Sequence, residues 1–411
     1  MSRRLLATLA VLSLFAAACG GGGSDEPETS STAASGPSDP TGDESSTTTA
    51  STTLPAGPPT TRGPAPDLVV QPLGALGAMT VLSGEPAYRG VLGQVDPDRN
   101  IVAAAALPPA AADTGIAPLT GLPLDDPSVA ARPAIVVKID NTSKGRPQEA
   151  LAQADLVYEE MIEGGFTRLA AVYHTHAPLL GPIRSGRTTD IAILGSLNSP
   201  VFAWSGANLV HAALLRRQDM IDLGAQSRSE YFRAADRPGT YDLMIEAETL
   251  HEIAAGRDGA APPLPHFEYR NAEVGLPETA EPATSVTVSF PSVTARWDWD
   301  PTLEGWARTQ GGTDHVDAQG ERVVAANVVV AEVRDVATGS VDTAGSTVFE
   351  QQFLGSGRGW VFTDGHLVEV TWTKPSIRSV ATWTTADGIP VALTPGTTWI
   401  ELAREGTTTV S

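Results

Sequence analysis

The hydrophobic and polar positions between Arg132 and Arg187 predict a group of strands joined by short charged loops. Residues 134–139 read AIVVKI, a β-branched apolar run typical of a strand buried on both faces. Residues 156–162 and 167–173 are two further strand-like runs on either side of Gly164-Gly165, which predicts a β-hairpin. A helix that runs through this turn is the competing interpretation.

Downstream segments mix helices with strands. Pro147 suits the first position of a short helix, and Gly256 suits the residue that ends a later one. The predicted helices cover residues 148–154, 188–197, 209–217 and 246–255, and a further strand covers residues 201–204. This mixture predicts an α/β domain over residues 114–275.

Residues 284–405 change to alternating strand-like runs separated by Asp-Gly and Pro-Gly turns. The runs cover residues 286–290, 323–333, 348–353, 367–372 and 399–402. Seven of the eight tryptophans lie here, and such residues most often fill the core of a sandwich or barrel, with a sugar-binding platform as the alternative. The predicted fold class is therefore α+β: a mixed α/β N-terminal domain followed by an all-β, sandwich or barrel-like, C-terminal domain.

The N-terminus carries a targeting pattern. Arg3 and Arg4 precede a mostly apolar run over residues 5–18, which is shorter than the about 20 residues of a membrane-spanning helix. Small residues then lead into Cys19, the only cysteine. Residues 1–19 are thus similar to a bacterial lipoprotein signal, which implies lipidation of Cys19 and anchoring to the outer face of the bacterial cell membrane. A lone cysteine excludes an intrachain disulfide.

The residues after the signal differ from it in composition. Residues 20–66 are rich in Ser, Thr and Pro and lack aromatic residues, so we expect a disordered tether. Residues 67–113 are an uncertain extension, which either supplies short strands to a domain or stays loosely held. The formal net charge of −21 argues against a nucleic-acid partner bound through phosphate contacts.

Charged residues gather in the loops of the 132–187 region. Residues 181–187 read GPIRSGR, an Arg/Ser/Gly turn before a helix that suits an anion. Strand alternation predicts that Glu159 and Glu163 share one face. We expect a polar cleft whose ligand-binding residues are Asp140, Asn141, Arg146, Gln148, Glu159, Glu163, Arg168, Arg184, Ser185 and Arg187. Arginines that only pair with neighbouring carboxylates would give the same pattern.

The ordered motifs KIDN, RPQ, ADLVYE, EGGFTR and GPIRSGR, from Lys138 to Arg187, resemble the YerB-type bacterial lipoproteins. The main domain of this family has no established function. The signal, the tether and the β-rich C-terminal part follow the same layout, and the resemblance covers about residues 119–403. It implies an extracytoplasmic, membrane-anchored protein of the cell envelope, and it implies no reaction.

The sequence lacks a P-loop lysine, a GxSxG elbow, an SxxK motif and an HExxH motif. His174 and His176 could form half of a zinc site, but structural or surface histidines are the commoner interpretation. We therefore predict neither a metal nor a cofactor.

Three functional hypotheses remain. The leading one is a lipoprotein without catalytic activity that binds a peptidoglycan fragment or a cell-wall enzyme through the polar cleft. The second is a cell-wall hydrolase or lyase in which Asp140, Glu159 and Glu163 supply the acid and the base. The third is a protein-interaction scaffold that uses the tryptophan-rich C-terminal domain.

Overall fold

The computed structural model describes residues 88–95 and 115–411, except for residues 272 and 343. Residues 88–95 belong to the extension predicted over residues 67–113. The predicted signal with Cys19, the tether and the other residues of that extension lie outside the described residues. Strands dominate the structure, with 39% of the described residues in strands and 13% in helices, so the β-rich character predicted from the sequence is confirmed. None of the described helices has the length and apolar composition that a membrane span requires.

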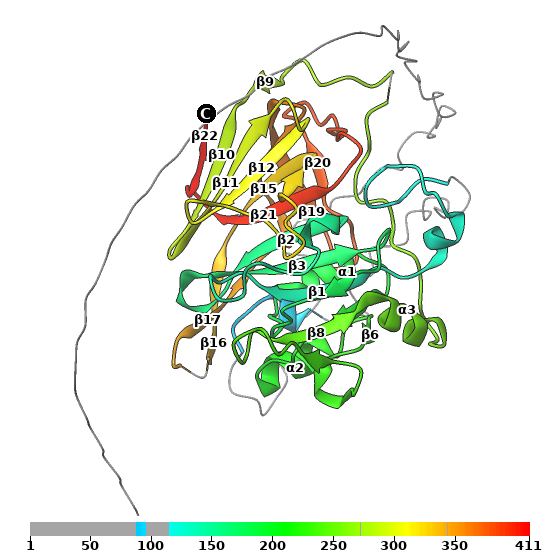
Figure 1. Cartoon of the computed structure of the whole chain (residues 1–411). Helices are drawn as coiled ribbons and strands as arrows, with labels where there is room; N and C mark the ends of the chain where they lie inside the picture. The colour runs from blue at the N-terminus through cyan, green and yellow to red at the C-terminus, as the bar shows by residue number, and fades with distance from the viewer. Residues whose placement is uncertain (1–87, 96–114, 272, 343) are drawn as a thin grey trace, which may run out of the picture. The chain divides into compact units, whose positions relative to one another are not determined.

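An eleven-stranded sheet draws strands from both predicted domains (Figure 1). In spatial order its strands are β20 (Thr382–Thr384), β19 (His366–Lys374), β18 (Gly355–Thr363), β15 (Asn327–Val333), β21 (Thr398–Arg404), β2 (Leu156–Met161), β3 (Thr167–Tyr173), β1 (Ile135–Asp140), β5 (Val201–Ala203) and β6 (Ile221–Asp222), with β9 (Glu281–Pro282) beside β19. Strands β2 and β21 pair in parallel, and this pairing joins the two parts of the chain.

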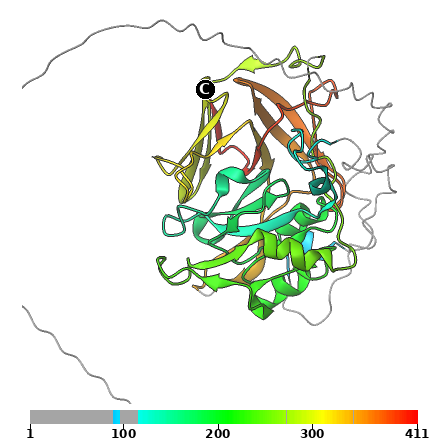
Figure 2. The same cartoon turned by 45° about the vertical axis from the view of Figure 1, so that its right-hand side comes forward.

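A six-stranded sheet packs against the C-terminal half of the large sheet, and Figure 2 shows the two layers apart. Its strands are β13 (Thr313–Asp314), β12 (Gly305–Gln310), β11 (Val293–Asp300), β10 (Ser285–Phe290) and β22 (Thr408–Val410), with β14 (Val324–Ala325) beside β12. Trp297 and Trp306 from this sheet share an apolar core with Val330 and Phe362 from the large sheet. Six of the seven C-terminal tryptophans are buried, so the core interpretation of these residues is correct.

Smaller elements complete the fold. Two short sheets contain β16 (Asp335–Val341) with β17 (Thr347–Gln351), and β4 (Leu179–Leu180) with β8 (Leu243–Glu246) and β7 (Phe232–Arg233). The α-helices are α1 (Asp190–Gly195), α2 (Leu209–Leu215) and α3 (Ala247–Ala255). The 3-10 helices are η2 (Leu92–Gln94), η4 (Pro127–Ala131), η5 (Leu151–Gln153), η6 (Glu163–Gly165) and η7 (Ala225–Ser227).

Strand β1 is covered on both faces, as its apolar sequence predicts. Ile135 and Val137 belong to one apolar core, and Val136 belongs to the core on the opposite face. β1 pairs antiparallel with β3 and parallel with β5, and β5 pairs parallel with β6. The helices around these three parallel strands are short, so a mixed α/β domain is not clearly present.

The predicted hairpin is present, and the competing helix is wrong. β2 and β3 pair antiparallel, and between them Gly164 and Gly165 adopt φ values of 72° and 73°, which favour glycine. The helix predicted over residues 148–154 shrinks to the single turn η5. Glu149 instead forms a β-bridge with Gly181, and Ala150 takes a left-handed backbone conformation, with φ 44° and ψ 34°, that interrupts an α-helix.

Candidate functional site

The ten predicted site residues do not line one cleft. They divide between two polar clusters on opposite faces of the sheet formed by β1, β2 and β3. The arginine cluster consists of Lys138, Asp140, Glu160, Glu163, Arg168, Arg184, Ser185, Arg187 and Asp190. The Glu159 cluster consists of Asn141, Gln148, Glu159, Thr167, Arg308, His315 and Glu401. Arg146 lies near the second cluster and donates to Gln310 O at 3.2 Å.

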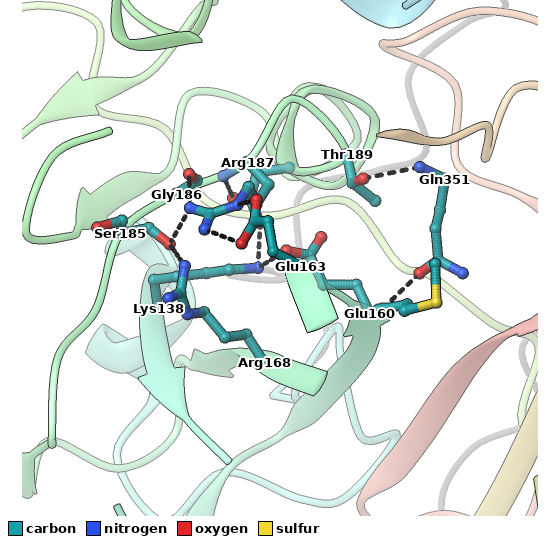
Figure 3. A network of polar contacts seen from close by, with 11 residues as sticks. Lys138, Glu160, Glu163, Arg168, Ser185, Gly186, Arg187, Thr189 and Gln351 are labelled. Carbon is teal, nitrogen blue, oxygen red and sulfur yellow. Dashed lines mark hydrogen bonds and ion pairs between the residues drawn. The ribbon is translucent and has the colours of Figure 1, made fainter. Parts of the chain in front are cut away.

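Two ion-pair groups form the inner part of the arginine cluster (Figure 3). The Nζ atom of Lys138 lies 2.5 Å from Glu160 Oε1 and 2.7 Å from Asp190 Oδ1, and all three side chains are fully buried. Arg187 donates from Nε and Nη2 to both oxygens of Glu163, so this fork is already occupied by a carboxylate. Burial and the neighbouring Asp190 raise the pKa of Glu160 to about 7.

Arg168 lacks such a carboxylate partner. It is 7% exposed, its Nη1 donates to Ser185 O at 3.0 Å, and its buried Nε has no hydrogen-bond partner among the described residues. Burial, together with the charges of Arg187 and Arg184, lowers the pKa of Arg168 to about 9. The fold thus disfavours the charged form of this guanidinium, and an added anion would offset that effect.

Arg184 forms the outer edge of the arginine cluster. Its Nε lies 3.0 Å from Asp140 Oδ2, its Nη1 donates to Thr240 O at 2.8 Å, and its side chain remains 26% exposed. The backbone places it beside the end of β1, because Arg184 N donates to Lys138 O at 2.8 Å. The carboxyl ends of parallel strands such as β1 and β5 are where open sheets of α/β proteins commonly bind ligands.

The Glu159 cluster is buried and nearly neutral. Glu159 forms an ion pair with Arg308, and both side chains are fully buried. Burial and the adjacent Glu159 raise the pKa of Glu401 well above its ordinary value, and burial lowers the pKa of His315 well below its own. Both shifts favour the neutral forms of these two side chains, which leaves the Glu159–Arg308 ion pair as the charged centre of the cluster. Arg308 also lies over the rings of Trp297 and Trp399, at 5.4 and 4.7 Å from their centroids.

The structure corrects the predicted faces. Glu163 lies beyond the end of β2 in η6 and turns to Arg187, whereas Glu159 points to the opposite side of the sheet and contacts Arg308. Each of the three carboxylates considered for catalysis is engaged in an ion pair: Asp140 with Arg184, Glu159 with Arg308 and Glu163 with Arg187.

Sequence reasoning missed several members of these clusters. Lys138 and Glu160 are charged residues inside apolar strands, and a lysine within AIVVKI was a usable signal because lysine is rarely fully buried without a partner. Asp190 and Arg308 gave no local signal. Arg308 meets Glu159 from a strand 149 residues further along the chain.

His174 and His176 do not form a pair, since His174 is fully buried and His176 is exposed. His174 instead lies near His251, which is 8% exposed, and Arg132 is the cation beside both. His174 Nδ1 and both ring nitrogens of His251 lack hydrogen-bond partners among the described residues. Within that part of the chain, no group of three or more His, Cys, Asp or Glu side chains is placed to hold a metal ion.

These two histidines predict acid sensitivity. Burial lowers the pKa of His174 to about 4 and that of His251 to about 3, below the ordinary value of 6.5 that each regains on unfolding. The unfolded chain therefore binds more protons, so their contribution to stability is present above pH 6.5 and is lost as the pH falls toward 4 and 3. His251→Phe should flatten the fall in the free energy of unfolding between pH 6.5 and 4, measured by urea denaturation. Parallel curves for the variant and the parent would contradict this.

A separate groove of about 730 Å³ lies in the C-terminal part, away from both clusters. Trp360 and Arg358 line it, with the Arg358 guanidinium 4.5 Å from the centroid of the indole ring. Trp360 is only 6% exposed, so it offers little indole surface to a sugar.

Comparisons with known proteins identify the relatives of this chain. Residues 119–260 match the N-terminal domain, and residues 286–400 the C-terminal domain, of a family described as a protein of unknown function, DUF3048. YerB of Bacillus subtilis (strain 168), a protein named as a lipoprotein, is 26% identical over 308 residues, covering 70% of this chain and 86% of YerB. The crystal structure of YerB matches with a TM-score of 0.61 at 22% identity, covering 72% of this chain and 99% of that one. The resemblance to YerB-type proteins is confirmed, and the likeness between the structures shows the fold.

Proposed function

We propose, from the premise that this chain belongs to the DUF3048 family, that it is an extracytoplasmic lipoprotein which binds an anionic ligand of the cell envelope. The relative named as a lipoprotein and the signal-like residues 1–19 support membrane anchoring through Cys19. Residues 20–66 would then serve as the tether that separates the folded part from the membrane.

The observation that carries the binding role is the unpaired guanidinium of Arg168. It lies near two other arginines, Arg184 and Arg187, and near two carboxylates, Asp140 and Glu163. The arginine cluster holds four cations and four carboxylates, but the carboxylates are shared unevenly. Lys138 takes two of them, Arg184 and Arg187 take one each, and Arg168 is the cation left without an ion-pair partner. Buried charges without a partner are unfavourable, so such a residue is explained by a ligand that completes the pair.

A carboxylate suits this position. Guanidinium forks bind carboxylates through paired, charge-assisted hydrogen bonds. Two partly exposed residues are neighbours of Arg168: Ser185, whose carbonyl accepts from it, and Arg184, whose charge acts on it. Arg187 is not among the proposed ligand-binding residues, because its guanidinium already donates to the Glu163 carboxylate. The proposed ligand is a peptidoglycan fragment, held by a carboxylate of its stem peptide.

Arg168→Gln should weaken muropeptide binding by about ten- to hundredfold, since a hydrogen bond to a charged group contributes about 1.5–3 kcal/mol. The melting temperature should stay equal or rise, because the substitution removes a charge that the fold disfavours. Isothermal calorimetry of the chain from Asp67 onward, with a panel of muropeptides, measures the first effect, and thermal unfolding measures the second.

Arg184→Ala should also remove binding, and it should lower the melting temperature as well, because the buried Asp140 loses its cation. Arg233→Ala is a matched control, because Arg233 is 65% exposed and its carboxylate partner Asp242 lies outside the arginine cluster. Unfolding of the Arg168 variant would show that this arginine is structural. A lytic activity on purified sacculi that Glu163→Gln abolishes would favour the hydrolase or lyase instead.

A further inference from the structure

A short segment upstream of β1, residues 88–95, is docked onto the body of the protein through one buried side chain. Glu350, on β17, is fully buried and accepts hydrogen bonds from Val91 N at 2.6 Å and Leu92 N at 2.8 Å through one oxygen. Its other oxygen accepts from the hydroxyl of Tyr88. A single carboxylate therefore binds a tyrosine side chain and two successive backbone amides.

The shape of the segment matches the surface beneath it. Leu92 is fully buried in the apolar core that includes Leu214 of α2, and η2 packs against both α1 and α2. A Cβ atom at Gly90 would come within 2.6 Å of the Glu350 carboxylate, and one at Gly93 would come within 2.6 Å of Leu214. A larger residue at either position would have to displace these side chains, so the glycines in the spacing Tyr-x-Gly-x-Leu-Gly suit the close approach of the segment.

The segment is held as a bound peptide is held. It joins no sheet of the structure, and among the described residues its one backbone-to-backbone bond to the rest of the chain runs from Arg89 N to Thr338 O, at 2.9 Å. Its turn is closed internally, since Gln94 Nε2 donates to Gly90 O at 2.6 Å and to Tyr88 O at 3.2 Å. Recognition thus combines the Glu350 bonds to two backbone amides with the burial of Leu92 and the contact to Tyr88, around a preformed turn.

The residues that contact the segment lie within the matched family domains, whereas the segment itself lies outside them. Leu214 and His211, whose ring meets the Tyr88 ring edge-on at 5.7 Å, fall within the matched residues 119–260. Glu350 falls within the matched residues 286–400. Residues 88–95 precede both matches. We propose that the groove around Glu350 is a peptide-binding site, which takes Tyr-x-Gly-x-Leu-Gly segments and is filled in this chain by its own residues 88–95.

The test adds the segment in trans. The full chain, purified in detergent with Leu92→Asp to eject its own segment, is titrated into a fluorescein-labelled peptide of residues 86–96, and fluorescence anisotropy is recorded. We expect saturable binding. The unsubstituted chain should bind at least about tenfold more weakly, because a tethered segment competes at an effective concentration near the millimolar range.

Matched variants test the contacts. Glu350→Gln in the Leu92→Asp chain should weaken peptide binding at least about tenfold, and a peptide with Tyr88→Ala should lose a similar factor. Equal binding by all of these proteins and peptides, or no binding by a Leu92→Asp chain whose circular dichroism is native, would overturn the proposal.

Hydrogen exchange of the unsubstituted chain decides the matter if the Leu92 variant does not fold. An exchangeable segment opens without global unfolding, so the amides of Val91 and Leu92 should exchange at least about tenfold faster than that of Val136 in β1. Exchange of all three amides at the rate of global unfolding would show that residues 88–95 are an integral part of the fold.

Discussion

Arg308→Met should lower the free energy of unfolding by about 3–5 kcal/mol, the usual loss when one partner of a buried ion pair is removed. The variant keeps most of the side-chain volume but leaves Glu159 fully buried without its cation, beside Glu401. It also removes the guanidinium from above the rings of Trp297 and Trp399. Urea denaturation followed by tryptophan fluorescence and by circular dichroism measures the loss.

Both probes should report one transition, because the eleven-stranded sheet runs through both predicted domains. Adding Glu159→Gln to the Arg308 variant should recover part of the stability, since the uncompensated charge is then gone. Arg296→Met on neighbouring β11 is the control, because Arg296 is 46% exposed and its pairing with Asp298 should contribute little. An Arg308 variant as stable as the control would contradict the account of the Glu159 cluster.

Lys138→Met should cost a similar amount, about 3–5 kcal/mol at neutral pH, because it leaves Glu160 and Asp190 buried without a cation between them. The loss should shrink on acidification. Lys138 lowers the pKa of Glu160, so its removal raises that pKa further above the unfolded value. A group with a raised folded pKa stabilises the protein at low pH and loses that contribution as the pH rises.

Unfolding of the Lys138 variant and the parent at pH 5 and pH 8 measures this difference. The gap between the two proteins should be larger at pH 8. Lys144→Met is the matched control, because Lys144 is exposed in the loop that follows β1. A gap independent of pH would show that removing Lys138 leaves the protonation of Glu160 unchanged.

Local patterns predicted the strands well. The apolar run of β1 and the Gly-Gly turn between β2 and β3 depend on nearest neighbours in the sequence, so these elements could be recognised without a structure. The helix expected after Pro147 failed because Glu149 pairs with Gly181, which is distant in the sequence, and because Ala150 takes a left-handed backbone conformation.

The candidate site was harder for the same reason. Residues 159 and 163 are four apart, and strand alternation would place them on one face, but β2 ends at Met161 and η6 redirects Glu163. Arg184 and Arg187 are equivalent in the sequence GPIRSGR, yet only Arg187 donates hydrogen bonds to both carboxylate oxygens of Glu163. Tertiary contacts determine that Arg168 is the guanidinium without a carboxylate partner, and these contacts cannot be inferred from the local sequence.

The burial of two of the three lysines also affects chemical labelling. Lys138 and Lys374 are fully buried, and Lys144 is exposed in the loop beside Asp140. Amine-reactive dyes therefore have one accessible lysine, next to the proposed ligand site, and a fluorophore there should report ligand binding directly. A cross-linking search for protein partners over the whole surface is better served by reagents that attack carboxylates, of which the chain has 48.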